Sequence, residues 1–301
     1  MISLDYVIGI DGGGTKTEGV AYDFQGNVLA QCTTGFGNLV VNKDEALGNI
    51  GLCIKSLLEE LKSQECKTIY LGLAGADSGN NKELIREYVE AFFKGEVKVM
   101  NDADIALSAL LKGEEGILTI AGTGSICFGR YNNKKARAGG WGHLLGDEGS
   151  GYYVAIEAFK NMTKEQDLDL PWSTLTKEML KALNFKEIDQ IKGFIYSKSK
   201  AEVASLAPVV VNAAKAGDEI ATNILKTAGT ELARITEMVY KKLDIKGVTH
   251  IGLKGSIITK IDLVKESFKE YLSKAIKNLQ IHDEDVSAAK GAYYFALKER
   301  N

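Results

Sequence analysis

The sequence of 301 residues predicts an α/β protein built from two similar halves. Each half opens with a strand, a glycine turn and a second strand, and the hydrophobic spacing then changes to that of helices. An apolar fraction of 45% and a charged fraction of 26% are typical of a globular chain with a packed core. The length is enough for two domains of ordinary size.

The first half begins with three expected strands, around Ile8–Ile10, over Thr17–Tyr22 and in GNVLAQCT, joined by glycine-rich turns as in an antiparallel meander. Apolar residues at helical spacing then predict a helix over Asp44–Leu61. The remaining elements are a buried strand in TIYLGLAG, a helix in NKELIREYVEAFFK, a short strand in VKVM and a helix in DADIALSALLKG.

The second half repeats the opening. GILTIAGTGSICFGRYNNKKARAG contains three expected strands and two turns. A long helical region follows from about Gly151 to Leu243, interrupted near Pro171 and Pro208. VTHIGLKGS is a strand that enters a Gly-Ser turn, and the tail from Val286 onwards is helical. The pattern indicates an old duplication with its boundary near Leu111–Gly116, which divides the chain into residues 1–112 and 113–287.

Charge and composition exclude several classes of function. A net charge of −3 and a pI near 5.8 give no overall attraction to nucleic acid or to anionic membranes. No apolar run is long enough to span a bilayer, and the start of the chain does not resemble a secretory signal, so we expect a cytoplasmic protein. The four cysteines lack C-x-x-C spacing and the three histidines are far apart, which predicts reduced thiols and no local zinc site.

The first glycine turn, in GIDGGGTKT, fits neither the dinucleotide fingerprint nor the P-loop, because the residues that follow it favour a strand over a helix. We therefore expect a hairpin. Without side chains at Gly12–Gly14, backbone N–H groups could approach a phosphate, and Thr15 and Lys16 could add a hydroxyl and a positive charge. An ordinary tight hairpin is the alternative.

A second turn, AGTGS at 121–125, repeats this pattern at the matching place in the second half. Two facing hairpins could hold a polyphosphate from both sides. A third glycine-hydroxyl site, LKGSI at 253–257, could face the nucleoside. Ser205, shortly before Pro208, is expected to cap the next helix and to aim its N–H groups toward the same site.

Five segments, GIDGGGTKT, NDA, AGTGS, GGWGHLLGDEGSGY and LKGSI, occur in the order found in one known family. The chain resembles the N-acetylglucosamine kinase branch of the BadF/BadG/BcrA/BcrD-like family, in the sugar kinase, Hsc70 and actin superfamily. The resemblance covers nearly the whole chain. It implies two ribonuclease-H-like domains with ATP and magnesium in an interdomain cleft, and leaves open whether the helix at about 288–301 packs back on the first domain. Relatives of this branch phosphorylate amino sugars at the 6-hydroxyl and are commonly homodimers.

The resemblance also implies roles for individual residues. It makes Asp102 the general base and Asp11 the residue that organises Mg²⁺ through water. It assigns the sugar to Asn38, Asp102, Ser125, Gly140, Trp141, Gly142 and Asp147. It assigns ATP to Gly13, Gly14, Thr15, Lys16, Thr123, Gly124, Ser205, Gly255 and Ser256.

Residue chemistry alone leaves alternatives to some of these roles. Asp102 follows a strand at the start of a helix, where it could cap the helix beginning at Ala103. Asp11 could be a turn residue of its own hairpin. Composition favours a core position for Trp141, and His143 is expected to hydrogen-bond its loop. Lys254 and Lys260 are expected to be solvated surface charges.

Three other functions compete with N-acetylglucosamine or N-acetylmuramic acid phosphorylation. Glucosamine kinase activity differs only in the acceptor, which a few loop residues decide. An ATP-driven activator of a 2-hydroxyacyl-CoA dehydratase would need cysteines for a bridging iron–sulfur cluster, and the cysteines here do not match that placement. A sugar sensor related to repressors would carry a DNA-binding helix-turn-helix, whereas the chain begins directly at its first strand.

Overall fold

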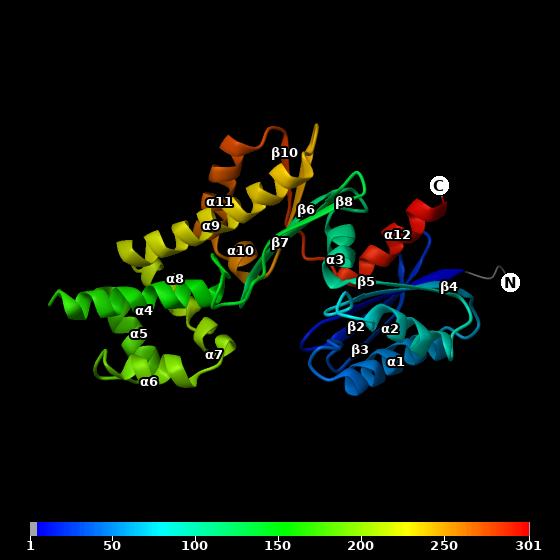
Figure 1. The fold of residues 1–301 in the computed structure, drawn as a ribbon, viewed down its shortest axis with the longest axis horizontal. Helices are drawn as coiled ribbons and strands as arrows, with labels where there is room; N and C mark the ends of the chain where they lie inside the picture. The colour runs from blue at the N-terminus through cyan, green and yellow to red at the C-terminus, as the bar shows by residue number, and fades with distance from the viewer. Residues whose placement is uncertain (1–4, 301) are drawn as a thin grey trace. The chain divides into compact units, whose positions relative to one another are not determined.

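The computed structural model describes residues 5–300, which form two compact units (Figure 1). The first unit contains the residues up to Glu115 together with those from Glu284 onwards, and the second contains Gly116–Asp283. Each unit has one five-stranded sheet with helices packed on it. The α/β class and the two-part organisation predicted from the sequence are therefore confirmed.

The sheet of the first unit begins with an antiparallel meander, as predicted. Its strands are β1 (Tyr6–Gly12), β2 (Thr17–Asp23), β3 (Val28–Thr34), β4 (Cys66–Leu73) and β5 (Glu96–Asn101). They lie in the order β3-β2-β1-β4-β5, with β1–β2 and β2–β3 antiparallel and β1–β4 and β4–β5 parallel.

Helices cover both faces of this sheet. They are α1 (Lys43–Glu60), α2 (Asn81–Glu90), α3 (Asp102–Leu110), the 3-10 turn η1 (Ala288–Lys290) and α12 (Gly291–Arg300). A Cβ on Gly19 would overlap Cys53 and Leu57 of α1, so Gly19 faces α1. Gly9 lies on the opposite face, where a Cβ would come within 2.0 Å of the carbonyl oxygen of Ala289 in η1. The C-terminal segment therefore packs directly on β1.

The second sheet repeats the topology of the first. Its strands are β6 (Gly116–Ala121), β7 (Ser125–Tyr131), β8 (Lys134–Gly139), β9 (Thr249–Lys254) and β10 (Leu279–His282). In the order β8-β7-β6-β9-β10, the first three are antiparallel neighbours and the last three are parallel. This is the arrangement of β3-β2-β1-β4-β5, which confirms the internal repeat at the level of topology. The sequence analysis did not foresee β10.

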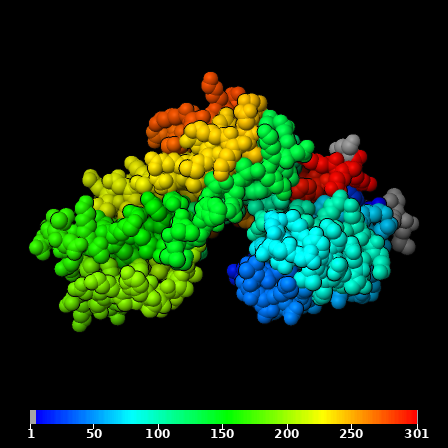
Figure 2. Space-filling model, viewed as in Figure 1, coloured from blue at the N-terminus to red at the C-terminus, as the bar shows by residue number. Residues whose placement is uncertain are grey.

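The helical part of the second unit is larger than that of the first. It comprises α4 (Gly151–Asp167), α5 (Thr174–Leu183), α6 (Gln190–Ser197), α7 (Lys200–Ala204), α8 (Ala207–Lys215), α9 (Glu219–Leu243), α10 (Ser256–Lys260) and α11 (Asp262–Ala275). Helix α9 packs on the sheet and on α11, and in Figure 2 its yellow atoms lie against the green helices α4 and α8. Pro171 lies in a break between helices, and the helical region is also interrupted at residues 205–206, directly before Pro208 in the first turn of α8; both interruptions were predicted. Helix α11 was not anticipated.

The cysteines of both units are free thiols, as predicted. Cys53 and Cys127 are fully buried. Burial raises the pKa of Cys127 to about 12, so its thiol stays protonated at neutral pH. None of the helices in residues 5–300 is long and apolar enough to cross a membrane.

Replacement of Gly229 by alanine should destabilise the second unit. Gly229 lies where α9 crosses α11, and a Cβ there would come within 2.2 Å of the Val264 carbonyl oxygen. Relieving this overlap requires a shift of backbone atoms, which costs free energy. We therefore expect a loss of about 1–3 kcal/mol in unfolding free energy, measured by urea titration. The control is Gly193→Ala in α6, where a Cβ would meet nothing within 4 Å. That variant should gain about 0.4–1 kcal/mol. Equal effects of the two substitutions would contradict the packing at Gly229.

Candidate functional site

The carboxyl ends of three parallel strands bring the predicted acidic residues of the first unit to one edge of its sheet. Gly12 is paired with Leu73, and Leu73 with Asn101, across β1, β4 and β5. Asp11 directly precedes Gly12 in β1, and Asp102 directly follows Asn101 at the end of β5. Adjacent strands are about 4.8 Å apart, so the two carboxylates belong to the same edge, separated by one intervening strand. Ligands of open α/β sheets bind at this edge.

Asp102 is the first residue of α3, and the cap of this helix is its neighbour. Asn101 is the N-cap residue, and its Oδ1 accepts from Ala103 N at 2.9 Å. The alternative in which Asp102 is the cap is therefore wrong, although Asp102 Oδ1 also accepts from Ala103 N at 2.9 Å. The partly positive start of α3 stabilises a negative charge at this position. Asp102 is half-buried, which suits a carboxylate that exchanges a proton with a bound hydroxyl.

The first glycine turn is a hairpin, as predicted. Gly13 N donates to the carbonyl oxygen of Lys16 at 3.0 Å, and Gly14, Thr15 and Lys16 are exposed. The Lys16 ammonium is 3.9 Å from the Glu18 carboxylate and its side chain is 60% exposed, so it remains available to an anion. Asp11 is part of strand β1 and paired with Glu18, which places it in the ladder and outside the turn itself.

Asn38 lies beside this hairpin. Gly37 N donates to the Gly13 carbonyl oxygen at 2.9 Å, which fixes the 35–42 loop on the turn. The Oδ1 atom of Asn38 accepts from Val40 N at 2.9 Å, and a Cβ on Gly75 would lie 3.1 Å from the same oxygen. The loop after β4, from Ala74 to Ser78, is therefore a neighbour of Asn38 that the sequence analysis missed. Its signal was the glycine-rich end of GLAGADSG, directly after a buried strand.

Ser125 joins the second glycine turn to the segment Gly139–Ser150. Ser125 N donates to Asp147 Oδ1 at 3.1 Å and Ser125 Oγ donates to the Glu148 carbonyl oxygen at 2.7 Å. The Ser125 carbonyl oxygen accepts from Gly140 N at 3.1 Å. Ser125 is 4% exposed, so in this structure its hydroxyl is committed to the loop.

Three glycines of this segment have a left-handed backbone conformation. Gly139, Gly140 and Gly142 have φ values of 70°, 71° and 84°, which disfavour larger residues. Trp141 is 65% exposed, so the core position favoured by composition is wrong; the Arg137 guanidinium lies 4.7 Å from its ring centroid. The ring is exposed enough to cover the apolar face of a ligand, with Arg137 beside it. His143 is also exposed and contacts the ring of Tyr152 edge-on.

Asp147 is the most buried of the predicted sugar-binding residues, with 3% exposure. Its Oδ2 is 2.5 Å from the Lys200 ammonium of α7, a partner that the sequence analysis missed. A Cβ on Gly124 would lie 2.5 Å from Lys200 Nζ and 3.0 Å from Asp147 Oδ1. A side chain at position 124 would therefore displace the Lys200 ammonium from its present place beside the turn.

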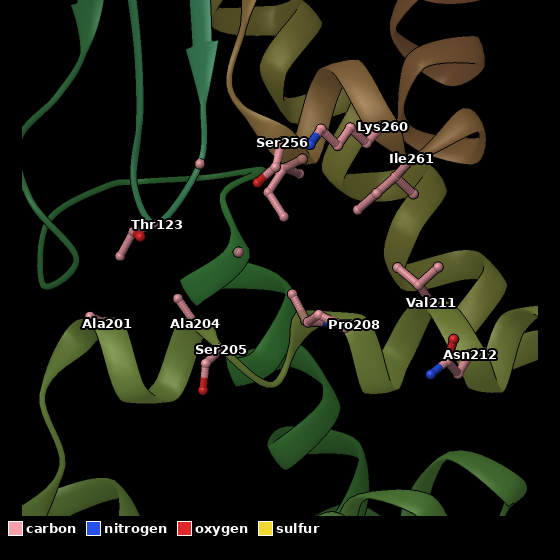
Figure 3. A pocket seen from close by; sticks show the side chains of 14 residues that line it. Thr123, Ala201, Ala204, Ser205, Pro208, Val211, Asn212, Ser256, Lys260 and Ile261 are labelled. Atoms are coloured by element: carbon pink, nitrogen blue, oxygen red, sulfur yellow. The ribbon is translucent and has the colours of Figure 1, made fainter. Parts of the chain in front are cut away.

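The second and third glycine turns meet at a pocket of about 470 Å³ within the second unit (Figure 3). Thr123, Ser205 and Ser256, all predicted to bind ATP, line it together, and Gly255 precedes Ser256. Pro208, Val211 and Ile261 give it apolar walls, which suits a nucleobase. Asn212 and Lys260 also line it and were missed. Lys260 is exposed, as expected, but its amine lies beside Ser256.

The predicted cap role of Ser205 is wrong. Ser205 ends α7, and its hydroxyl donates to the Glu202 carbonyl oxygen at 2.6 Å, directed away from Ser256 in Figure 3. The reason is a capping box: Ser199 and Glu202 start an additional short helix immediately before Pro208. Leu206 therefore occupies the position before α8.

The donor set fits a magnesium ion that arrives with a nucleotide. No group of three or more His, Cys, Asp or Glu side chains within residues 5–300 could hold a metal ion by itself. Magnesium needs no such group, because it keeps several waters and binds one or two carboxylates plus substrate phosphates. Asp11, at the sheet edge shared with Asp102, supplies a carboxylate of this kind.

Comparison with known proteins decides the family. A sequence model of the "BadF/BadG/BcrA/BcrD ATPase family" matches residues 8–296. The chain belongs to this ATPase family. The match runs from β1 to α12 and so includes every candidate residue described above.

Relatives with assigned activities match over nearly their whole length. An N-acetylmuramic acid/N-acetylglucosamine kinase of Clostridium acetobutylicum is 33% identical, covering 98% of this chain and 99% of the relative. An N-acetyl-D-glucosamine kinase of Dictyostelium discoideum is 30% identical, covering 99% and 100%. The fold matches the crystal structure of a candidate N-acetylglucosamine kinase from Chromobacterium violaceum, with a TM-score of 0.72 and 24% identity over 96% of this chain and 97% of that one.

Substitution of Gly255 by alanine should disrupt the pocket. Gly255 has a φ of 98°, and a Cβ there would lie 2.4 Å from the Ala121 carbonyl oxygen at the end of β6. Strain and overlap together predict a loss of at least about 2 kcal/mol in unfolding free energy. Gly122→Ala, in the same pocket, is the control, because a Cβ at that position meets nothing within 4 Å. Urea titration of both variants compares them, and a Gly255→Ala protein as stable as Gly122→Ala would refute the close approach of β6 and β9 at Gly255.

Proposed function

We propose that this protein is an ATP-dependent amino-sugar kinase that transfers the γ-phosphate of ATP to the 6-hydroxyl of N-acetylglucosamine. N-acetylmuramic acid is the second acceptor to consider, since the C. acetobutylicum relative is named for both sugars. Glucosamine is the alternative acceptor, because a glucosamine kinase of Vibrio cholerae is 26% identical over 98% of this chain.

The observation that carries the proposal is the position of Asp102. It is a half-buried carboxylate at the start of α3, on the same sheet edge as Asp11 and in the same unit as Asn38. A sugar kinase needs such a group to accept the proton of the attacking hydroxyl. The full-length similarity to two named amino-sugar kinases supports the same conclusion.

The reaction assigns a task to each part. Asn38, Trp141 and the Gly139–Ser150 segment would hold the sugar. The turns at Gly13–Lys16 and Thr123–Gly124 would hold the phosphates, and the pocket of Ser205 and Ser256 would hold the nucleoside. Asp102 takes the proton from the 6-hydroxyl as its oxygen forms a bond to the γ-phosphorus, while the bond from that phosphorus to the β–γ bridging oxygen breaks and ADP leaves.

Magnesium, when bound with ATP, would neutralise charge that develops on the phosphates. Asp11 would hold it through water. The start of α3 places a partly positive helix end beside the Asp102 carboxylate. Lys16, exposed beside the first turn, adds a positive charge for the phosphates.

A coupled ADP-release assay tests this function directly. The purified protein, ATP and MgCl₂ would be incubated with N-acetylglucosamine, N-acetylmuramic acid, glucosamine, glucose and 6-deoxy-N-acetylglucosamine. We expect sugar-dependent ADP release with at least one amino sugar and none with the 6-deoxy analogue, because that analogue lacks the attacking hydroxyl. Release only with glucose, or equal release with the 6-deoxy compound, would contradict the proposal.

Asp102→Asn should separate chemistry from binding. An amide cannot accept the proton, so kcat should fall by about 10² or more while KM for sugar and ATP changes little. Steady-state kinetics measure both constants. Asp44→Asn, an exposed acid in the first turn of α1, is the matched control and should retain wild-type turnover. Wild-type turnover of Asp102→Asn would remove this residue from the mechanism.

The burial of the cysteine thiols argues against the alternative function as a dehydratase activator with an iron–sulfur cluster. Cys53 and Cys127 are fully buried, and burial raises the pKa of Cys66 to about 12, which opposes the thiolate that an iron–sulfur cluster requires. The named relatives also favour sugar phosphorylation.

A further inference from the structure

Lys200 is a residue of helix α7 whose ammonium lies beside the second glycine turn. It is the first residue of the short helix α7, where Ser199 and Glu202 form a capping box. Its ammonium is 2.5 Å from Asp147 Oδ2, and the two side chains are 30% and 4% exposed. Lys200 therefore faces a buried carboxylate on one side and keeps some access to solvent.

The same ammonium touches the turn itself. A Cβ built on Gly124 would lie 2.5 Å from Lys200 Nζ, so the ammonium is in contact with the backbone of Gly124. The turn is held rigidly: Gly122 N donates to the Gly124 carbonyl oxygen at 2.9 Å, and Gly151 N of α4 donates to the Gly122 carbonyl oxygen at 2.8 Å. An anion bound at this turn would thus meet a hydrogen-bonded backbone and the Lys200 ammonium.

Helix α7 also forms part of the pocket. Ala201 and Ala204 line it, and so does Ser205 at the end of the helix. Lys200 is adjacent in sequence to the first of these residues. Helix α7 therefore carries both residues that line the proposed nucleoside pocket and the lysine that pairs with Asp147.

We propose that Lys200 is a phosphate-binding residue of the nucleotide site, held by Asp147 until a nucleotide arrives. This inference rests on the proposed function for the presence of ATP. In the nucleotide-free protein the ammonium pairs with Asp147. When a triphosphate lies on the Gly122–Gly124 turn, the ammonium turns to the phosphate, and Asp147 gains a free oxygen for a sugar hydroxyl.

The exchange is physically reasonable for both partners. The lysine stem is flexible and its ammonium carries three donors, so it can move between acceptors without a backbone shift. Asp147 retains the hydrogen bond from Ser125 N when the ammonium leaves. A phosphate carries more negative charge than a carboxylate and competes well for the lysine. Nucleotide binding would in this way prepare the sugar-binding segment.

The test measures binding and does not depend on turnover. Isothermal titration would compare Lys200→Met with wild type, using AMP-PNP with MgCl₂ as one ligand and adenosine as the other. Loss of one charge-assisted hydrogen bond predicts about 10- to 100-fold weaker AMP-PNP binding. Adenosine affinity should change less than about twofold, because adenosine has no phosphate for Lys200 to contact. If the affinities for AMP-PNP and adenosine fall by the same factor, Lys200 only supports the fold, and the proposal is overturned.

Two further variants control for charge and for position. Lys200→Arg keeps the charge and should recover part of the AMP-PNP affinity. Lys198→Met removes a lysine two residues away whose ammonium pairs with Glu202 on the surface, at 2.9 Å. This variant should bind both ligands as wild type does. If its affinity for AMP-PNP falls as much as that of Lys200→Met, the proposal is also overturned.

Asp147→Asn gives a prediction of opposite sign. It removes the carboxylate that competes for Lys200, so AMP-PNP should bind more tightly, by about two- to tenfold, with adenosine unchanged. Weaker AMP-PNP binding in this variant would refute the exchange. If Lys200→Met alone fails to fold because Asp147 is left unpaired, the comparison of Lys200→Met/Asp147→Asn with Asp147→Asn yields the same lysine effect. Failure of wild type to bind AMP-PNP would instead refute the proposed function.

Discussion

The hydrogen bonds of Ser125 hold the second unit's candidate site in one arrangement. Its amide binds the Asp147 carboxylate, its hydroxyl binds the Glu148 carbonyl oxygen, and its own carbonyl oxygen binds Gly140 N. The glycine turn before Ser125 and the Gly139–Ser150 segment therefore cannot move independently. Because Ser125 is the first residue of β7, the rigidity of the sheet is transmitted to both.

Glycine serves different purposes at different places in this site. At Gly124 the missing side chain makes room for the pair of Lys200 and Asp147, and at Gly255 it permits the close approach of β9 to the end of β6. At Gly122 and Gly14 a Cβ would meet nothing, so the space beside these two residues is open to a ligand. The glycines of the turns are thus partly structural and partly a means of exposing backbone N–H groups.

The repeated topology explains why the two units carry similar turns. In each sheet the central strand is followed by a hairpin, β1 to β2 and β6 to β7, and is flanked on its other side by a parallel strand. The hairpin turn therefore lies at the carboxyl end of the central strand both times. What differs is the surroundings: α3 with Asp102 in the first unit, and α4, α7 and α10 around a pocket in the second.

Much of the site follows from local chemistry that a sequence displays. Because strand-like sequence follows Gly12–Gly14 and Gly122–Gly124, both turns could be identified as hairpins. The start of α3 at Asp102 could be placed because a short apolar strand ends there and apolar residues at helical spacing follow. The helix cap at Asn101 could have been predicted in the same way, because asparagine directly before a helix is a preferred N-cap residue. Two short elements, α7 and β10, have no extended hydrophobic pattern and were missed, and Ser205 was misassigned because α7 was not foreseen. Helix α11 was also missed, although Val264, Phe268 and Leu272 are buried at helical spacing along its 14 residues.

The sequence by itself determined the α/β class, the two halves and the hairpin turns, because hydrophobic spacing and glycine content act within a few residues. Only the tertiary structure decided that Trp141 is exposed, that Thr123, Ser205 and Ser256 share one pocket, and that Lys200 faces Asp147 across Gly124. Each of these contacts joins residues far apart in the chain, and their distance is set by how the sheet and helices pack, which no local pattern records.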